Sequence, residues 1–72
     1  MKNPAIGYYE NGQKSYEEYW KGYNLHRLDG PAAQYWRRNG ELSCAIYYIN
    51  GEEIECSSDQ EFEKIVKLLI FK

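Results

Sequence analysis

The chain has 72 residues, enough for one small domain but close to the size at which a single hydrophobic core barely suffices. Hydrophobic residues make up 43% of the sequence and aromatic residues 17%, which argues against disorder. The formal net charge of −2 argues against a general nucleic-acid binder, because such proteins usually carry a basic stripe.

The first residues lack the apolar stretch of a secretion signal. The longest apolar run, residues 68–71, is too short to cross a bilayer. We therefore expect a soluble cytoplasmic protein that has no membrane partner.

A short aromatic pattern that ends in Asn-Gly occurs twice between residues 8 and 53. Residues 8–12, Tyr-Tyr-Glu-Asn-Gly, return as residues 35–40, Tyr-Trp-Arg-Arg-Asn-Gly. Residues 19–22, Tyr-Trp-Lys-Gly, return as residues 47–51, Tyr-Tyr-Ile-Asn-Gly. Such a repetition indicates one supersecondary unit that is copied and stacked. The sequence therefore predicts two tandem β-repeats.

The Asn-Gly pairs predict tight hairpins, because a two-residue type I′ turn needs positive φ at both positions. Between the turns lie runs rich in Tyr, Trp, Ile and Ala. We predict an antiparallel meander of about six strands, over residues 5–10, 13–20, 23–26, 32–38, 41–49 and 52–56. The predicted turn centres are Asn11-Gly12, Lys21-Gly22, Asn39-Gly40 and Asn50-Gly51.

The predicted register assigns apolar side chains to both faces of the sheet. A two-residue turn at Asn50-Gly51 places Tyr47 opposite Ile54. Because side chains alternate along a strand, this pair assigns the remaining strand residues to one face or the other. One face, which we call the Tyr47 face, receives Gln34, Trp36, Ala45, Tyr47, Ile49, Ile54 and Cys56. The other, the Tyr48 face, receives Tyr35, Leu42, Cys44, Ile46, Tyr48, Glu53 and Glu55.

The last residues have the pattern of a helix over residues 58–71. Ser58 and Glu61 form a capping box, and apolar residues follow at helical spacing. So short a helix must dock on the sheet to be stable, and the Tyr47 face is the nearest platform. If it covered the Tyr48 face instead, the exposed residues would be Trp36, Tyr47 and their neighbours. The whole chain, residues 1–72, is thus one α+β domain with a β-repeat sheet over 4–56 and a capping helix over 58–71.

Residues 26–29, His-Arg-Leu-Asp, are the one polar cluster that suggests a catalytic site. His26 as a general base oriented by Asp29 would need a nucleophile, and no such motif, second His or phosphate-binding loop accompanies it. Turn chemistry at residues 29–31, Asp-Gly-Pro, accounts for the same residues. Cys44 and Cys56 fall on opposite faces and are expected to be buried, reduced thiols. We expect no catalytic residue, metal or cofactor.

Residues 19–22, Tyr-Trp-Lys-Gly, are followed by residues 25–32, Leu-His-Arg-Leu-Asp-Gly-Pro-Ala. This pattern resembles the Asp-Gly-Pro-Ala repeats of phage, giant-virus and bacterial proteins, which are grouped with MORN-like repeats, and the resemblance covers residues 4–55. The chain departs from the pattern where Lys21-Gly22 replaces Asn-Gly and where residues 52–56 replace the second His-Arg link. The resemblance implies a phage or virus-type accessory protein that acts in the host cytoplasm. Its role would be to occlude a host protein, in an antitoxin-like or anti-defence manner.

With the helix on the Tyr47 face, the Tyr48 face is left as an apolar patch with a charged rim. Such a patch is typical of a partner site or a homodimer interface. One alternative is a nucleic-acid or nucleotide binder that uses arginine and stacked aromatics, although 11 carboxylates argue against it. Another is a structural, self-assembling repeat protein. The predicted partner-binding residues are Tyr35, Arg37, Leu42, Ile46 and Tyr48.

Overall fold

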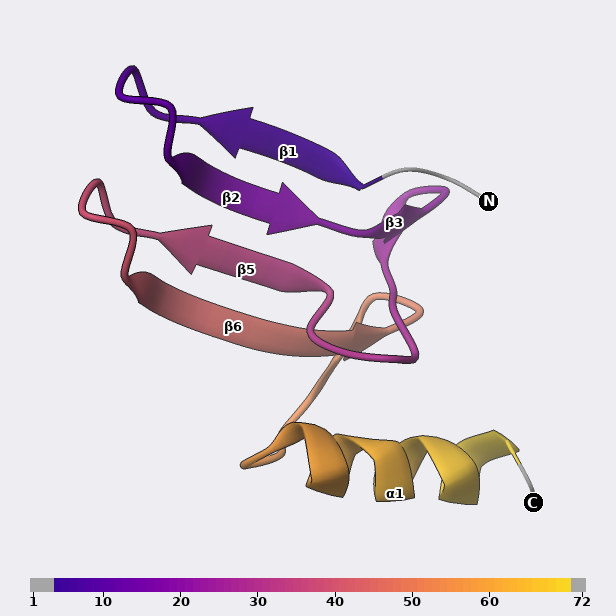
Figure 1. Ribbon diagram of the computed structural model, residues 1–72. Coiled ribbons are helices and arrows are strands. Elements are labelled where there is room, and N and C mark those ends of the chain that lie inside the picture. The colour runs from indigo at the N-terminus through magenta and orange to yellow at the C-terminus, as the bar shows by residue number, and fades with distance from the viewer. Residues whose placement is uncertain (1–3, 71–72) are drawn as a thin grey trace.

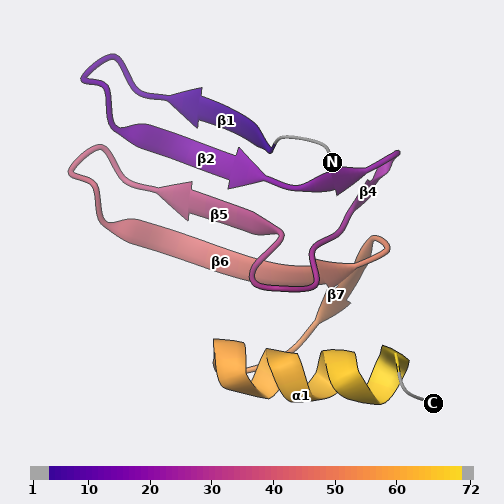
Figure 2. The ribbon, with the colours of Figure 1, turned by 45° about the vertical axis from the view of Figure 1, so that its right-hand side comes forward.

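The computed structural model describes residues 4–70 and has the predicted α+β architecture. Five antiparallel strands form a sheet of order β1-β2-β5-β6-β7, two more form a small ladder β3-β4, and one helix follows (Figure 1). The helix lies beyond β6 and β7 at one end of the sheet, and β1 is the outer strand at the other end (Figures 1 and 2). The elements are β1 Ala5–Tyr8, β2 Lys14–Glu18, β3 Trp20–Lys21, β4 Asn24–Leu25, β5 Ala33–Trp36, β6 Leu42–Ile49, β7 Glu52–Ile54 and α1 Asp59–Ile70.

The core of the domain is small. Within residues 4–70, the buried hydrophobic residues are Ala32, Ala33, Phe62 and Val66. The principal dimensions of 45 × 26 × 17 Å fit a sheet that is open on much of both faces. The fold therefore depends on strand pairing and local contacts more than on a deep hydrophobic interior.

The hairpin β5–β6 closes with a three-residue loop and not with the predicted type I′ turn. The Arg37 N–H donates to the Glu41 carbonyl at 2.8 Å, which leaves residues 38–40 as the loop. Gly40 has a φ of 92°, whereas Asn39 is not at positive φ. The Oδ1 atom of Asn39 instead accepts the Glu41 N–H at 2.9 Å, as expected for a type I turn followed by a left-handed glycine. The hairpin β1–β2 has the same bonds, from Tyr9 N–H to the Gln13 carbonyl (2.8 Å) and from Gln13 N–H to Asn11 Oδ1 (2.9 Å).

The extra loop residue changes the pairing at the start of β6. Tyr35 pairs with Cys44, which agrees with their predicted common face. Trp36, however, pairs with Leu42, so a β-bulge leaves Ser43 without a partner. The assignment of Leu42 to the Tyr48 face was therefore wrong, because the bulge places it opposite Trp36.

The turn at Asn50-Gly51 is the one that has the predicted type I′ character. Asn50 is the only non-glycine residue of the described chain with positive φ, at 52°, and Gly51 follows at 83°. The pairing of Tyr47 with Ile54 confirms the register predicted from this turn. At the turn predicted for Lys21-Gly22, Lys21 pairs with Asn24, so the turn is centred one residue later than expected.

The predicted strand over residues 13–20 is divided at Tyr19. The Tyr19 N–H donates to the Ala32 carbonyl at 2.8 Å, beside β5, whereas its carbonyl accepts the His26 N–H at 2.9 Å. The chain thus changes partner at this residue, and β3 leaves the main sheet to pair with β4. This change of partner is a tertiary event that strand propensity does not encode.

Helix α1 begins as its capping box predicts. The Ser58 hydroxyl oxygen accepts the Glu61 N–H at 3.1 Å, which satisfies one free donor of the first turn. The ring of Phe62 lies 4.5 Å from that of Tyr47, centroid to centroid, so the helix packs through the Tyr47 face. Phe71, the last residue of the predicted helix, lies outside the described residues. No helix in residues 4–70 is long and apolar enough to span a bilayer.

Candidate interaction face

The register of the main sheet brings an aromatic and apolar set together on the Tyr48 face. Two cross-strand rows run over β1, β2, β5 and β6, and a third row joins β6 to β7. Since directly paired residues point to the same side of a sheet, each row lies on one face. The rows are Gly7–Tyr16–Tyr35–Cys44, Ala5–Glu18–Ala33–Ile46 and Tyr48–Glu53.

The Tyr48 face is open to solvent over much of its area. Tyr16 is 38% exposed and Trp20, two residues beyond Glu18, is 42% exposed. Tyr35, Ile46 and Tyr48 are half-buried. Because α1 packs through Tyr47, it does not cover these side chains.

Three of the five predicted partner-binding residues meet on this face. Tyr35, Ile46 and Tyr48 are brought together by β5 and β6, whereas Leu42 lies opposite Trp36 and is 49% exposed. Arg37 is exposed at the closing position of the hairpin loop. The bulge moves Leu42 to the side of Trp36, whereas Arg37 stays at the hairpin end, one residue beyond the paired part of β5.

Sequence reasoning missed three residues of the face, Tyr16, Glu18 and Trp20. Strand alternation alone puts the three on one side of their segment. Their position beside Tyr35 depends on the pairing of β2 with β5, which lie on either side of a long connection. A connection of that length does not set a register in the way a tight hairpin turn does.

Glu18 lies among these aromatic side chains and is held by two of them. The Tyr35 hydroxyl donates to Glu18 Oε2 at 2.7 Å, and the Trp20 Nε1–H group donates to Oε1 at 3.3 Å. The hydrogen bond to Glu18, followed by burial, raises the pKa of Tyr35 to about 12. The phenol therefore remains a hydrogen-bond donor into the alkaline range, where an ordinary tyrosine would lose its proton. The carboxylate keeps a defined position on the face.

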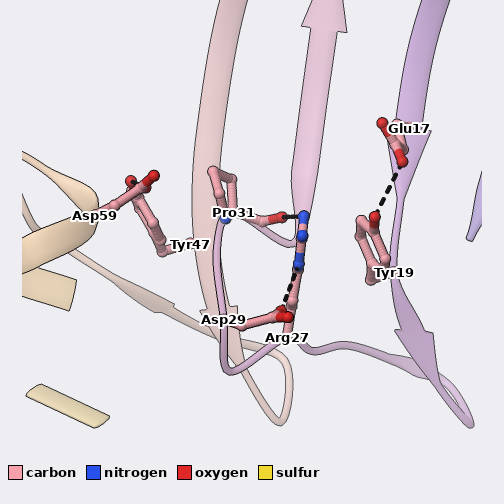
Figure 3. Close-up of polar contacts among 7 residues, drawn as sticks. All are labelled: Glu17, Tyr19, Arg27, Asp29, Pro31, Tyr47 and Asp59. Atoms are coloured by element: carbon pink, nitrogen blue, oxygen red, sulfur yellow. Dashed lines mark hydrogen bonds and ion pairs between the residues drawn. The ribbon is translucent and has the colours of Figure 1, made fainter. Parts of the chain in front are cut away.

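The Asp-Gly-Pro link is organised around Arg27 (Figure 3). The Arg27 Nε–H donates to Asp29 Oδ1 at 2.8 Å, and its Nη1–H donates to the Pro31 carbonyl at 3.2 Å. The guanidinium carbon lies 4.1 Å from the centroid of the Tyr19 ring. The bond from Arg27 is also the main reason that the pKa of Asp29 is lowered. These contacts give Asp29 a role in the conformation of the loop.

His26 makes a different contact. Its Nδ1 atom accepts the Asn50 N–H at 2.9 Å, which ties the segment after β4 to the turn between β6 and β7. Burial, and to a lesser extent the charge of Lys21, lowers the pKa of His26. His26 and Asp29 thus bond different partners, and the hydrogen bonds of the described residues do not join them as a base and its orienting acid.

The other candidate sites are less well formed. Cys44 and Cys56 are free, and Cys44 is exposed, so the expectation that both thiols are buried was wrong. Residues 4–70 contain no group of three or more His, Cys, Asp or Glu side chains placed to hold a metal ion. A pocket of about 210 Å³ lies between the link loop and α1, lined by Leu28, Asp29, Asp59, Phe62 and Glu63.

Each carboxylate of that pocket already has a partner. Asp29 accepts the bond from Arg27, Asp59 accepts one from the Tyr47 hydroxyl, and Glu63 pairs with Lys67 at 3.2 Å. The pocket therefore lacks a convergent set of free polar groups, unlike the open Tyr48 face.

No protein-family model, curated protein or solved structure matches this chain. The resemblance to Asp-Gly-Pro-Ala repeats accordingly rests on the motif residues alone. Arg27, Asp29 and Pro31 of that motif have the loop-forming contacts described above.

Proposed function

We propose that this chain is a non-catalytic protein-binding module that docks on its partner through the Tyr48 face. The observation that supports the proposal is an uncovered, largely aromatic sheet face next to a small core. Tyrosine and tryptophan provide a large contact area at low cost in side-chain entropy, and they are enriched at interfaces. The binding residues would be Tyr16, Trp20, Tyr35, Ile46 and Tyr48.

The biological setting we propose is that of a phage or virus-type accessory protein that occludes a host protein, in an antitoxin-like or anti-defence role. The resemblance of residues 4–55 to Asp-Gly-Pro-Ala repeats supports this setting. A sheet face that covers a partner surface would act by steric exclusion and would need no catalytic group.

The nucleic-acid alternative has less support. Arg38 lies over the Tyr9 ring at 5.2 Å and Lys14 lies over the Trp36 ring at 5.1 Å. These basic and aromatic side chains would have to separate before bases could stack between them.

A random-peptide library panned on the immobilised chain tests the proposal. We expect enriched peptides to bind the wild type but not the variant Ile46→Arg. Tyr16→Arg should also fail to bind them, and it is less prone to misfold because the Tyr16 side chain is more exposed than that of Ile46. Ala45→Arg is the matched control, because Ala45 is exposed and adjacent in sequence but lies on the Tyr47 face. Circular dichroism verifies that each variant is folded.

Two results would overturn the proposal. The first is that no peptide is enriched, and the second is that the Tyr48-face variants bind as well as Ala45→Arg does. Light scattering on the same proteins covers self-association: a wild-type dimer that becomes a folded monomer in Ile46→Arg would identify the partner as a second copy.

A further inference from the structure

We propose that the Tyr48 face binds a basic peptide segment, with an arginine of the partner beside Glu18 and against the rings of Trp20 and Tyr35. The inference rests on the proposed function and deepens it by naming the chemistry of the partner. It is based on the distribution of charge between the two faces and on the aromatic rings that have no cation over them.

The Tyr48 face carries negative charge that its own residues do not neutralise. Its cross-strand rows contain Glu18 and Glu53 and, within the described residues, no lysine or arginine. Glu18 is half-buried, so solvent and salt screen its charge less than that of a fully exposed carboxylate. The described lysines and arginines lie outside these rows, at Lys14, Lys21, Arg27, Arg37, Arg38, Lys64 and Lys67. Arg37 follows β5 at the hairpin end, where strand alternation from Tyr35 puts it at the margin of the Tyr48 face.

Among the described residues, most aromatic rings away from the Tyr48 face lie against a cation or another ring, and the exceptions, Tyr8 and Tyr23, are 63% and 99% exposed. On the Tyr47 face, Lys14 lies over Trp36 at 5.1 Å and Arg27 over Tyr19 at 4.1 Å. Tyr47 packs on Phe62. In the described part of the chain no cation lies over the rings of the Tyr48 face, which are Tyr16, Trp20, Tyr35 and Tyr48.

An aromatic surface around a fixed carboxylate matches an arginine side chain. The guanidinium group stacks on aromatic rings and donates charge-assisted hydrogen bonds to a carboxylate. Glu18 is already oriented by Tyr35 and Trp20, and each of its oxygens has further acceptor capacity. Because the carboxylate is held in place before binding, less side-chain entropy is lost when a cation docks.

Peptides selected on the wild-type chain provide the probe. We expect them to be enriched in arginine, and we expect substitution of that arginine by glutamine to weaken binding by about tenfold, the loss of one charge-assisted contact. The protein variant Glu18→Gln should weaken binding of the original peptide to a similar extent. Its single amide oxygen can accept the shorter bond from Tyr35 but not also the bond from Trp20, which goes to the other carboxylate oxygen. Circular dichroism therefore verifies that the variant is folded.

Glu52→Gln is the matched control, because it removes the same charge from an exposed residue that pairs with Ile49 on the Tyr47 face. Binding to this variant should equal binding to the wild type. If the selected peptides bind the Tyr48 face but lack basic residues, or bind Glu18→Gln as tightly as the wild type, this inference is wrong while the proposed function stands. If no peptide binds that face, both are overturned.

Discussion

Tyr35 and Glu18 lie on neighbouring strands and are joined by a hydrogen bond of 2.7 Å across the Tyr48 face. The bond is diagonal, because Glu18 pairs in register with Ala33 and Tyr35 pairs with Tyr16. It links the strand of the first hairpin to the strand of the second, and it fixes the carboxylate among the aromatic rings. A contact that stabilises the sheet thereby also shapes the proposed binding face.

Loss of this bond should destabilise the protein moderately. Tyr35→Phe removes the donor and keeps the ring, so we expect the free energy of unfolding to fall by about 1 kcal/mol. Urea denaturation followed by circular dichroism measures the change. Tyr23→Phe is the control, because the Tyr23 side chain is 99% exposed and should give no measurable change. An unchanged stability for Tyr35→Phe would mean that the bond does not persist in solution.

Because of the same bond, the stability of the protein should depend on pH in the alkaline range. The pKa of Tyr35 is about 12 in the folded protein and about 10 in an unfolded chain. The folded state therefore retains the proton over this window, and stability should be lost as the pH rises from about 10 to 12. Tyr47 has a pKa of about 12 for similar reasons, so the wild type should lose more stability than either Tyr35→Phe or Tyr47→Phe. Urea denaturation at several pH values provides the test.

Acid should weaken the turn that His26 supports. The pKa of His26 is lowered in the folded state, so an unfolded chain binds the proton more readily. Stability is thus complete above the unfolded pKa of about 6.5 and should decrease as the pH falls below that value. His26→Asn offers an acceptor without this titration, and denaturation at about pH 7.5 and pH 5 should show a smaller difference for it than for the wild type. An equal difference would assign the acid sensitivity to other groups.

The two kinds of Asn-Gly turn should respond oppositely to glycine. Asn50 has a φ of 52°, so Asn50→Gly relieves an unfavourable conformation and should be neutral or slightly stabilising. Asn39 lies outside the positive-φ region, and its side chain accepts the Glu41 N–H. Asn39→Gly should therefore lower the free energy of unfolding by about 1 kcal/mol. Thermal unfolding of both variants measures the two effects. If Asn39→Gly were the more stable of the two, the assigned turn types would be wrong.

Gly7 lies under an aromatic ring of the neighbouring strand. A Cβ atom at this position would stand 2.1 Å from Cε2 of Tyr16, so Gly7→Ala must displace the ring from the Tyr48 face. We expect the aromatic NMR signals of Tyr16 to shift and the stability to decrease. In a Tyr16→Ser background, Gly7→Ala should be neutral or stabilising, because the obstacle is gone and glycine weakens a strand. Additive effects of the two substitutions would rule out the contact.

Local features of the sequence predicted much of the molecule. The Asn50-Gly51 turn set the pairing of Tyr47 with Ile54, and Ser58 with Glu61 marked the start of α1. These features act between residues that are close in sequence, so propensity and hydrogen-bonding chemistry determine them directly. The loop at Asn39-Gly40 was misjudged because the same dipeptide fits both a two-residue and a three-residue loop.

The pairing of β2 with β5 was decided by the tertiary structure alone. This pairing places Tyr16 and Glu18 beside Tyr35 and so completes the candidate face. It depends on the link that is folded around Arg27, where contacts to Asp29 and Pro31 hold a connection too long for a turn rule to describe. The sequence by itself determined the hairpins and the helix, since their partners are near neighbours in the chain. Only packing across the link could determine which hairpin strands meet, and therefore which side chains share a face.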